Sequence, residues 1–186
     1  MRIVGGKYKG KSLNHIKSFT TRPLKDVVKE NIFNILSHSN EVGINLESSK
    51  VLDLYSGTGS FGIECVSRGA KKVTFVEKDK NALKVLKKNL SEIKINNEAI
   101  LIDDSVENYL SRNKKEKYNI FFFDPPFSEK KFLENLRSIR IFKNFFKNHV
   151  VVIHREKDAQ DDFKNEINIL KIKIYGRSKI FFGVFY

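Results

Sequence analysis

The fold of this chain is best predicted from one stretch of nine residues, Val51-Leu52-Asp53-Leu54-Tyr55-Ser56-Gly57-Thr58-Gly59. The first five are apolar except for one acid, a pattern that predicts a short buried strand. The glycines that follow fit Gly-x-Gly-x-x-Gly, ending at Gly62, and a helix is predicted over about residues 61–68. Such a unit brings a ligand against the backbone of the glycine loop. The stretch therefore predicts the first strand, loop and helix of a ligand-binding α/β sheet.

Strands and helices alternate on both sides of this unit. Helices are predicted from Leu24 to Leu36 (apolar at Leu24, Val27, Val28, Ile32, Ile35 and Leu36), from the cap Asp79 to Leu90, and over about residues 130–146. Further strands are predicted at residues 73–77, 100–102, 120–123 and 150–153, and a hairpin at 167–174 and 180–186 around Gly176-Arg177-Ser178. We predict an α/β fold with a Rossmann-like, doubly wound, mostly parallel sheet and a C-terminal antiparallel hairpin.

The organisation predicted from length and composition is one domain over residues 1–186. Residues 1–22 are expected to form a basic N-terminal arm or hairpin, and residues 23–186 a core that begins with a helix. A single cysteine excludes a disulfide framework and favours a reducing, cytoplasmic compartment. The start has no signal-peptide pattern, no apolar run is long enough for a membrane span, and the four histidines lack metal-ligand spacing. We therefore expect no membrane partner and no metal.

The positive charge of the chain is unevenly distributed. Lys and Arg number 35 against 22 Asp and Glu, a net charge of +13, which codon bias toward lysine could also produce. Residues 1–30 carry eight basic and two acidic side chains, residues 50–110 ten and nine, and residues 111–150 ten and four. Two basic regions thus flank a nearly neutral centre, as two sides of a nucleic-acid cleft would. The RNA-binding candidates in the first region are Arg2, Lys7, Lys9, Lys11 and Arg22.

The glycine loop could hold either a dinucleotide or S-adenosylmethionine. Glu77 lies twenty residues after Gly57 and could accept hydrogen bonds from ribose hydroxyls in both cases. Asp53 favours S-adenosylmethionine, since a carboxylate repels pyrophosphate but attracts an ammonium and a sulfonium. Asp104 could accept from the adenine amine, with Asp103 as the rival. The predicted cofactor-binding residues are Asp53, Tyr55, Ser56, Gly57, Gly59, Glu77 and Asp104.

The segment Asp124-Pro125-Pro126-Phe127 directly follows the predicted strand 120–123. Two prolines end the strand and remove two N–H donors, which leaves a carboxylate, free carbonyls and an aromatic ring. This set suits a planar amine: Asp124 and the Pro125 carbonyl each accept an N–H, and Phe127 stacks on the ring. We interpret Asp124, Pro125 and Phe127 as the catalytic residues of direct methyl transfer to an exocyclic amine. Cys65 is expected in the core. His154 follows a predicted strand and could reach a cleft, but we interpret it as an ordinary surface residue and assign it no role.

Taken together, these motifs resemble the bacterial RsmD family, 16S rRNA (guanine(966)-N(2))-methyltransferase. The resemblance covers nearly the whole chain and rests on the following segments: Arg2-Ile3-Val4-Gly5-Gly6, Thr21-Arg22-Pro23, Asp53 to Gly59, Ser67-Arg68-Gly69-Ala70, Glu77 and Asp124 to Phe127. It implies a class I S-adenosylmethionine-dependent methyltransferase that modifies a guanine amine in 16S rRNA, in the small ribosomal subunit or its assembly intermediates. It also implies that the N-terminal arm contacts RNA. Leu24 and Tyr55-Ser56 depart from the family pattern, which usually has Thr and Phe-Ala there.

Three other functions stay open on the sequence. The same chemistry could act on adenine N6 in DNA or on a small molecule. A nicotinamide-binding Rossmann protein would share the glycine loop and Glu77. An RNA-binding protein without catalysis would share the basic regions.

Overall fold

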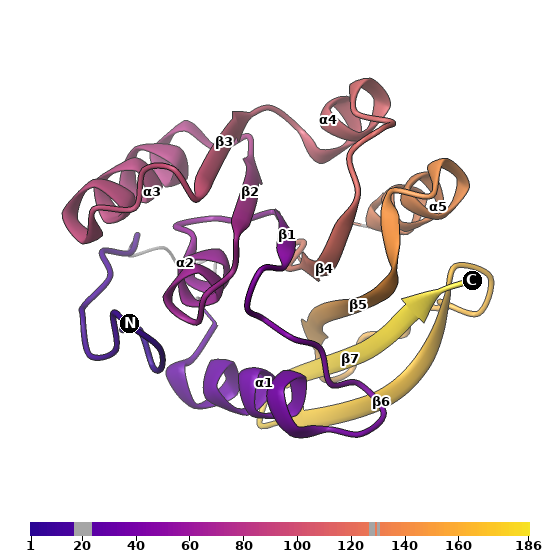
Figure 1. Ribbon diagram of the computed structural model, residues 1–186. Helices are drawn as coiled ribbons and strands as arrows, with labels where there is room; N and C mark the ends of the chain where they lie inside the picture. The colour runs from indigo at the N-terminus through magenta and orange to yellow at the C-terminus, as the bar shows by residue number, and fades with distance from the viewer. Residues whose placement is uncertain (17–23, 127–128, 130) are drawn as a thin grey trace.

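The computed structural model describes residues 1–16, 24–126, 129 and 131–186. A seven-stranded sheet runs through the molecule in the order β3-β2-β1-β4-β5-β7-β6 (Figure 1). Its strands are β1 Lys50–Leu54, β2 Lys72–Glu77, β3 Ala99–Asp103, β4 Tyr118–Phe123, β5 Phe145–Glu156, β6 Ile167–Tyr175 and β7 Ser178–Phe185. The first five pair in parallel, while β7 pairs antiparallel with both β5 and β6. The predicted doubly wound sheet with a C-terminal hairpin is confirmed.

Helices cover both faces of the sheet because its central strands are apolar on both sides. They are α1 Asp26–His38, α2 Ser60–Ser67, α3 Lys80–Ile93, α4 Val106–Arg112 and α5 Phe132–Phe142. Ile120 and Phe122 of β4 pack with α1, α2 and α3, whereas Phe121 and Phe123 pack with α4 and α5. The period of two along the strand thus divides the core into two layers. No helix among the described residues is long and apolar enough to cross a membrane.

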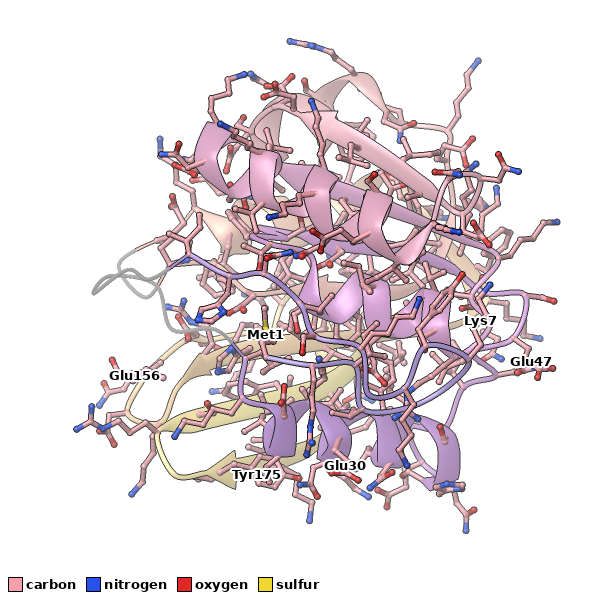
Figure 2. All side chains as sticks on the ribbon, turned by 90° about the vertical axis from the view of Figure 1, so that its left-hand side faces the viewer. Met1, Lys7, Glu30, Glu47, Glu156 and Tyr175 are labelled. Atoms are coloured by element: carbon pink, nitrogen blue, oxygen red, sulfur yellow. The ribbon has the colours of Figure 1, made fainter. Side chains whose placement is uncertain are left out.

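Residues 1–16 fold back on themselves and lie across α2, between α1 and α3 (Figures 1 and 2). Arg2 pairs antiparallel with Ser12, and Ile3 is fully buried. The N–H of Lys7 donates to the carbonyl of Ser67 at 2.7 Å. The segment is therefore a docked part of the fold with its basic side chains outward.

Buried charges fasten this segment to the helices. Lys29 of α1 is buried, and its Nζ donates to the carbonyl of Arg2 at 2.7 Å and lies 3.7 Å from Glu64 of α2. Glu64 also accepts from the N–H of Val4 at 2.8 Å and from Nε of Arg68 at 2.8 Å. Burial lowers the pKa of Lys29, although Glu64 and Asp26 oppose the shift. Each charge in this cluster has a partner, as burial requires.

Four details of the predicted elements were wrong or missing. The helix predicted over residues 130–146 ends at Phe142, because Lys143 takes a left-handed φ of 51°. The side-chain Nδ2 of Asn144 then donates to the carbonyl of Glu116 at 2.9 Å. Strand β5 accordingly begins at Phe145 rather than 150. Helix α4 was not predicted: it has seven residues, and its cap Ser105 accepts from the N–H of Asn108. Val27, expected on the apolar face of its helix, is 67% exposed.

Candidate functional site

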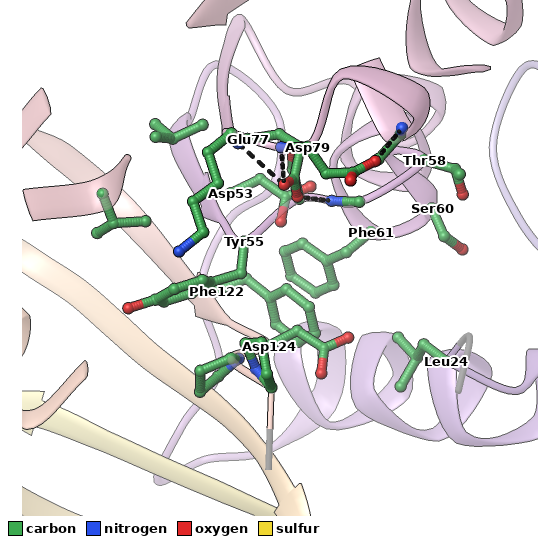
Figure 3. Close-up of a pocket in the computed structure, with 18 of the residues that line it drawn as sticks. Leu24, Asp53, Tyr55, Thr58, Ser60, Phe61, Glu77, Asp79, Phe122 and Asp124 are labelled. Carbon is green, nitrogen blue, oxygen red and sulfur yellow. Dashed lines mark hydrogen bonds between the residues drawn. The ribbon is translucent and has the colours of Figure 1, made fainter. Parts of the chain in front are cut away.

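The carboxyl ends of β1 to β4 open into a pocket of about 480 Å³ (Figure 3). The strand order reverses between β1 and β4, where open α/β sheets bind their ligands. The glycine loop and the ends of β2 and β3 form one side, and the tip of β4 forms another. Met1, His15 and Ile16 of the docked N-terminal segment complete the wall. Leu24, just before α1, lines it as well, so residues from six separate parts of the chain share one cavity.

Asp53 points into this pocket from β1 (Figure 3) and is 1% exposed. Its Oδ2 accepts the N–H of Gly62 at 2.9 Å, whereas Oδ1 has no hydrogen-bond partner among the described residues. Burial raises the pKa of Asp53 well above its usual value, and the nearby carboxylates of Asp124 and Glu77 add to the rise. A buried acid in this state is stabilised as an anion by a cation placed at Oδ1.

The glycine loop takes its shape from its own backbone angles and from Glu77. Gly57 and Gly59 have φ values of 55° and 84°, and a Cβ on Gly59 would lie 2.3 Å from Cδ1 of Leu86. The carboxylate of Glu77 accepts the N–H of Gly57 at 2.7 Å through Oε2, and the N–H of Asp79 at 2.8 Å through Oε1. Oε1 also accepts the N–H of Lys78 at 2.9 Å, so Oε2 is the oxygen that keeps a further lone pair for a ligand. Glu77 thus joins β2 to the loop, a role that its spacing did not reveal.

The structure distinguishes the two candidate acids after β3. Asp104 lines the pocket, whereas the exposed Asp103 pairs outside it with Nζ of Lys80 at 2.6 Å. Asp104 accepts from Nδ2 of Asn108 and from the N–H of Ser105, both at 2.8 Å, and these hydrogen bonds lower its pKa. Of the two, Asp104 is the acid available to a pocket ligand.

Tyr55 and Ser56 line the pocket next to the glycine loop. Tyr55 has a left-handed φ of 58°, and its hydroxyl accepts from Nδ2 of Asn135 on α5 at 2.8 Å. The hydroxyl of Ser56 is buried and has no partner among the described residues. In addition to Oδ1 of Asp53, Oγ of Ser56 is thus a second buried polar atom to which a ligand could form a hydrogen bond.

Asp124 lies at the tip of β4 and points into the pocket, which Pro125 and Pro126 also line (Figure 3). Phe122, two residues earlier, stacks on Phe61 of α2 with ring centroids 3.9 Å apart. Phe127, predicted to stack on the substrate, lies outside the described residues. The β4 side of the pocket thus combines a carboxylate, two prolines and an aromatic wall.

Two residues that the sequence analysis left without a role hold this tip in place. Nδ1 of His154 lies 2.9 Å from Oδ1 of Asp124, and Nη1 of Arg155 donates to the carbonyl of Pro126 at 3.3 Å. Both are buried at the end of β5, where Arg155 also pairs with Asp161 at 2.8 Å. Their place after the apolar run 150–153, beside the strand that bears Asp124, was the signal that could have identified them. The expectation that His154 is an ordinary surface residue was wrong, because its side chain is 5% exposed.

The other predicted residues that the structure describes do not line the pocket. Arg2, Lys7, Lys9 and Lys11 are exposed on the docked segment, and Arg22 lies outside the described residues. Cys65 is buried in the core as expected, and burial raises the pKa of its thiol. Within the described ranges, no group of three His, Cys, Asp or Glu side chains could hold a metal ion.

The strand order and the pocket at its reversal define the class: this protein has the fold of S-adenosylmethionine-dependent methyltransferases. It belongs to the family described as Conserved hypothetical protein 95, whose model matches residues 1–184. Ribosomal RNA small subunit methyltransferase D of Haemophilus influenzae is 35% identical over 179 residues, which make up 95% of this chain and 89% of that protein.

Comparisons of sequence and of structure with Escherichia coli show the same relationship. Ribosomal RNA small subunit methyltransferase D of strain K12 is 34% identical over 127 residues, or 68% of this chain and 60% of that one. The solved structure of yhhF superimposes with a TM-score of 0.84 at 25% identity, covering 100% of this chain and 97% of its own. The predicted resemblance to the RsmD family is confirmed, and the chain is a methyltransferase of that family.

Proposed function

We propose that this protein transfers a methyl group from S-adenosylmethionine to the exocyclic N2 amine of a guanine in 16S rRNA, within the small ribosomal subunit or an assembly intermediate. One observation carries the proposal: Asp53 and Asp124 meet in a single pocket at the carboxyl ends of neighbouring strands. One carboxylate is placed for a cationic donor and the other for an amine acceptor. The names of the H. influenzae and E. coli relatives support small-subunit rRNA as the substrate.

The residues on the β1 side fit S-adenosylmethionine. The unpartnered Oδ1 of Asp53 suits the ammonium and sulfonium charges, and the buried hydroxyl of Ser56 offers a further hydrogen bond. Glu77 accepts from the ribose hydroxyls while it holds Gly57, and Asp104 accepts from the adenine amine. A pyrophosphate would meet three carboxylates here, so a dinucleotide fits poorly.

The β4 side fits a planar amine. The carboxylate of Asp124 and the carbonyl of Pro125 each accept one N–H of the amine, because the two prolines leave this turn with acceptors only. Acceptors held off the ring plane localise the nitrogen lone pair. When bound, S-adenosylmethionine supplies a methyl group on a positively charged sulfur. The nitrogen of the substrate amine takes this methyl group from the sulfur by in-line displacement. Asp124 then accepts the proton that the methylated nitrogen gives up.

Methylation with labelled S-adenosylmethionine tests this function. We expect label in 16S rRNA or small subunits, and N2-methylguanosine after digestion to nucleosides. Asp124→Asn is expected to lose turnover and keep cofactor affinity. Label in adenine N6, in DNA or in a small molecule would overturn the guanine assignment, and absence of both label and cofactor binding would overturn the whole proposal.

A charge reversal tests the RNA surface on the docked segment. Changing Lys7, Lys9 and Lys11 to Glu is expected to weaken RNA methylation and spare cofactor binding, since these side chains are exposed outside the pocket. For every phosphate that the protein no longer neutralises, the log–log slope of RNA affinity against salt concentration becomes shallower by about 0.7–0.9. The matched control reverses three exposed lysines of α3, which lie in the nearly neutral centre of the sequence: Lys84, Lys87 and Lys88. If both triple variants lost RNA methylation equally, the N-terminal lysines would form no specific RNA surface, and the positive charge would reflect composition alone.

A further inference from the structure

His154 lies buried between Asp124 and the hairpin at the edge of the sheet. Its side chain is 5% exposed, with Nδ1 2.9 Å from Oδ1 of Asp124 and Nε2 2.9 Å from Oγ of Ser178. Parallel pairing of β4 with β5 sets Phe123 beside Ile153, and so Asp124 next to His154. Ser178 comes from the start of β7, which pairs antiparallel with β5. Three strands thus build one line of hydrogen bonds that ends in the pocket.

The partners of the ring decide which nitrogen carries a proton. An ionised carboxylate only accepts, so Nδ1 must be protonated and donate to Asp124. Nε2 faces a hydroxyl that can either donate or accept. The imidazole therefore keeps both hydrogen bonds whether it is neutral or charged.

Asp124 needs this donor because of the prolines that follow it. An Asp at a turn usually accepts a hydrogen bond from the backbone N–H two residues further on. Here that residue is Pro126 and the one between is Pro125, and neither has an N–H. Neither of the two residues that follow Asp124 can therefore donate to its carboxylate, and His154 supplies a donor from β5.

We propose that His154 is the positioning residue of the acceptor site: its Nδ1–H holds Oδ1 of Asp124 and leaves Oδ2 to accept from the substrate amine. This inference rests on the proposed function and assigns the orientation of its acceptor carboxylate. Among the residues that the structure describes, the charged groups that act on the ring are Asp124 at the tip of β4 and Arg155 on its own strand. Burial and Arg155 lower the pKa of His154, but the Asp124 carboxylate outweighs them and the pKa is raised. The ring and the carboxylate thus attract each other.

A pair of substitutions tests the hydrogen bond itself. His154→Leu fills the space without a donor, whereas the Nδ2 of Asn in His154→Asn can replace Nδ1–H. We expect His154→Leu to lower kcat about 10- to 100-fold, as misplaced catalytic groups do, with KM and cofactor Kd nearly unchanged. His154→Asn is expected to recover most of kcat. The matched control is His38→Asn on the exposed end of α1, which is expected to leave both constants unchanged.

A second measurement does not depend on activity. The pKa of His154, followed by NMR of the imidazole, is expected to fall in the Asp124→Asn variant, because the carboxylate that raises it is gone. An unchanged pKa would overturn the inference, as would a folded His154→Leu protein with wild-type kcat. So would a His154→Asn protein as slow as His154→Leu while both bind S-adenosylmethionine. If the wild-type protein methylates no RNA, the proposed function fails, and the NMR titration still decides the contact between His154 and Asp124.

Discussion

Replacing Asp53 with Asn separates the binding role of this carboxylate from any part in holding the fold. The amide has nearly the same shape, and its oxygen can still accept the N–H of Gly62 that Oδ2 now accepts at 2.9 Å. Its NH2 group replaces the unpartnered Oδ1 and presents donors where a cationic ligand needs an acceptor. The change therefore preserves the contact inside the protein and removes the one offered to the ligand.

We expect cofactor affinity and stability to move in opposite directions. Hydrogen bonds to charged groups contribute about 1.5–3 kcal/mol, so S-adenosylmethionine is expected to bind about 10- to 150-fold more weakly to Asp53→Asn. In the free protein, burial raises the pKa of Asp53 above its value in the unfolded chain. The folded wild-type protein then binds more protons than the unfolded chain, and its stability falls as pH rises through this raised pKa. Asp53→Asn has no carboxyl group to ionise at this position, so it does not lose stability in this way as the pH rises.

Calorimetry for S-adenosylmethionine and urea denaturation from about pH 5 to about pH 8 measure both effects. The free energy of unfolding of Asp53→Asn minus that of the wild type is expected to increase with pH. Asp103→Asn is the control, because the exposed Asp103 pairs with Lys80 outside the pocket. Unchanged cofactor affinity in Asp53→Asn would refute the reasoning. A loss of stability of equal size at every pH would refute it too, since the carboxylate would then be structural.

Two further predictions concern stability and are tested by urea denaturation. Gly59→Ala is expected to lower the free energy of unfolding by about 2–5 kcal/mol. The alanine would have to adopt the left-handed φ of 84°, and its methyl group would lie 2.3 Å from Cδ1 of Leu86. Gly57→Ala, at φ 55° with no atom within 4 Å of the added Cβ, is expected to cost about 1–2 kcal/mol; equal losses would contradict the packing argument. Glu64→Gln is expected to cost about 3–5 kcal/mol, because it removes the buried carboxylate 3.7 Å from Lys29 and leaves the partly exposed Asp26 at 4.0 Å in its place. A loss below about 1 kcal/mol would contradict this account.

Local patterns in the sequence were enough to predict most of the sheet and much of the pocket. The apolar run before Gly57 and the run before Asp124 each mark a buried parallel strand, and carboxyl ends of parallel strands share one edge. The sequence pattern therefore places Asp53, Glu77 and Asp124 at the edge of the sheet where the pocket opens. Short elements could not be predicted in this way. The seven residues of α4 carry too few apolar positions to show a helical period.

The tertiary structure decided what depends on contacts between distant strands. Spacing could not separate Asp103 from Asp104. Adjacent residues at the end of a strand point to opposite sides, and the sequence does not show which side faces the pocket. The unpartnered Oδ1 of Asp53 follows from burial by neighbours that sequence distance does not reveal. His154 lies 30 residues after Asp124, and only the parallel pairing of β4 with β5 brings its ring to that carboxylate. The sequence by itself thus determined which chemical groups the site contains, and the pairing of the strands decided how each of them is held.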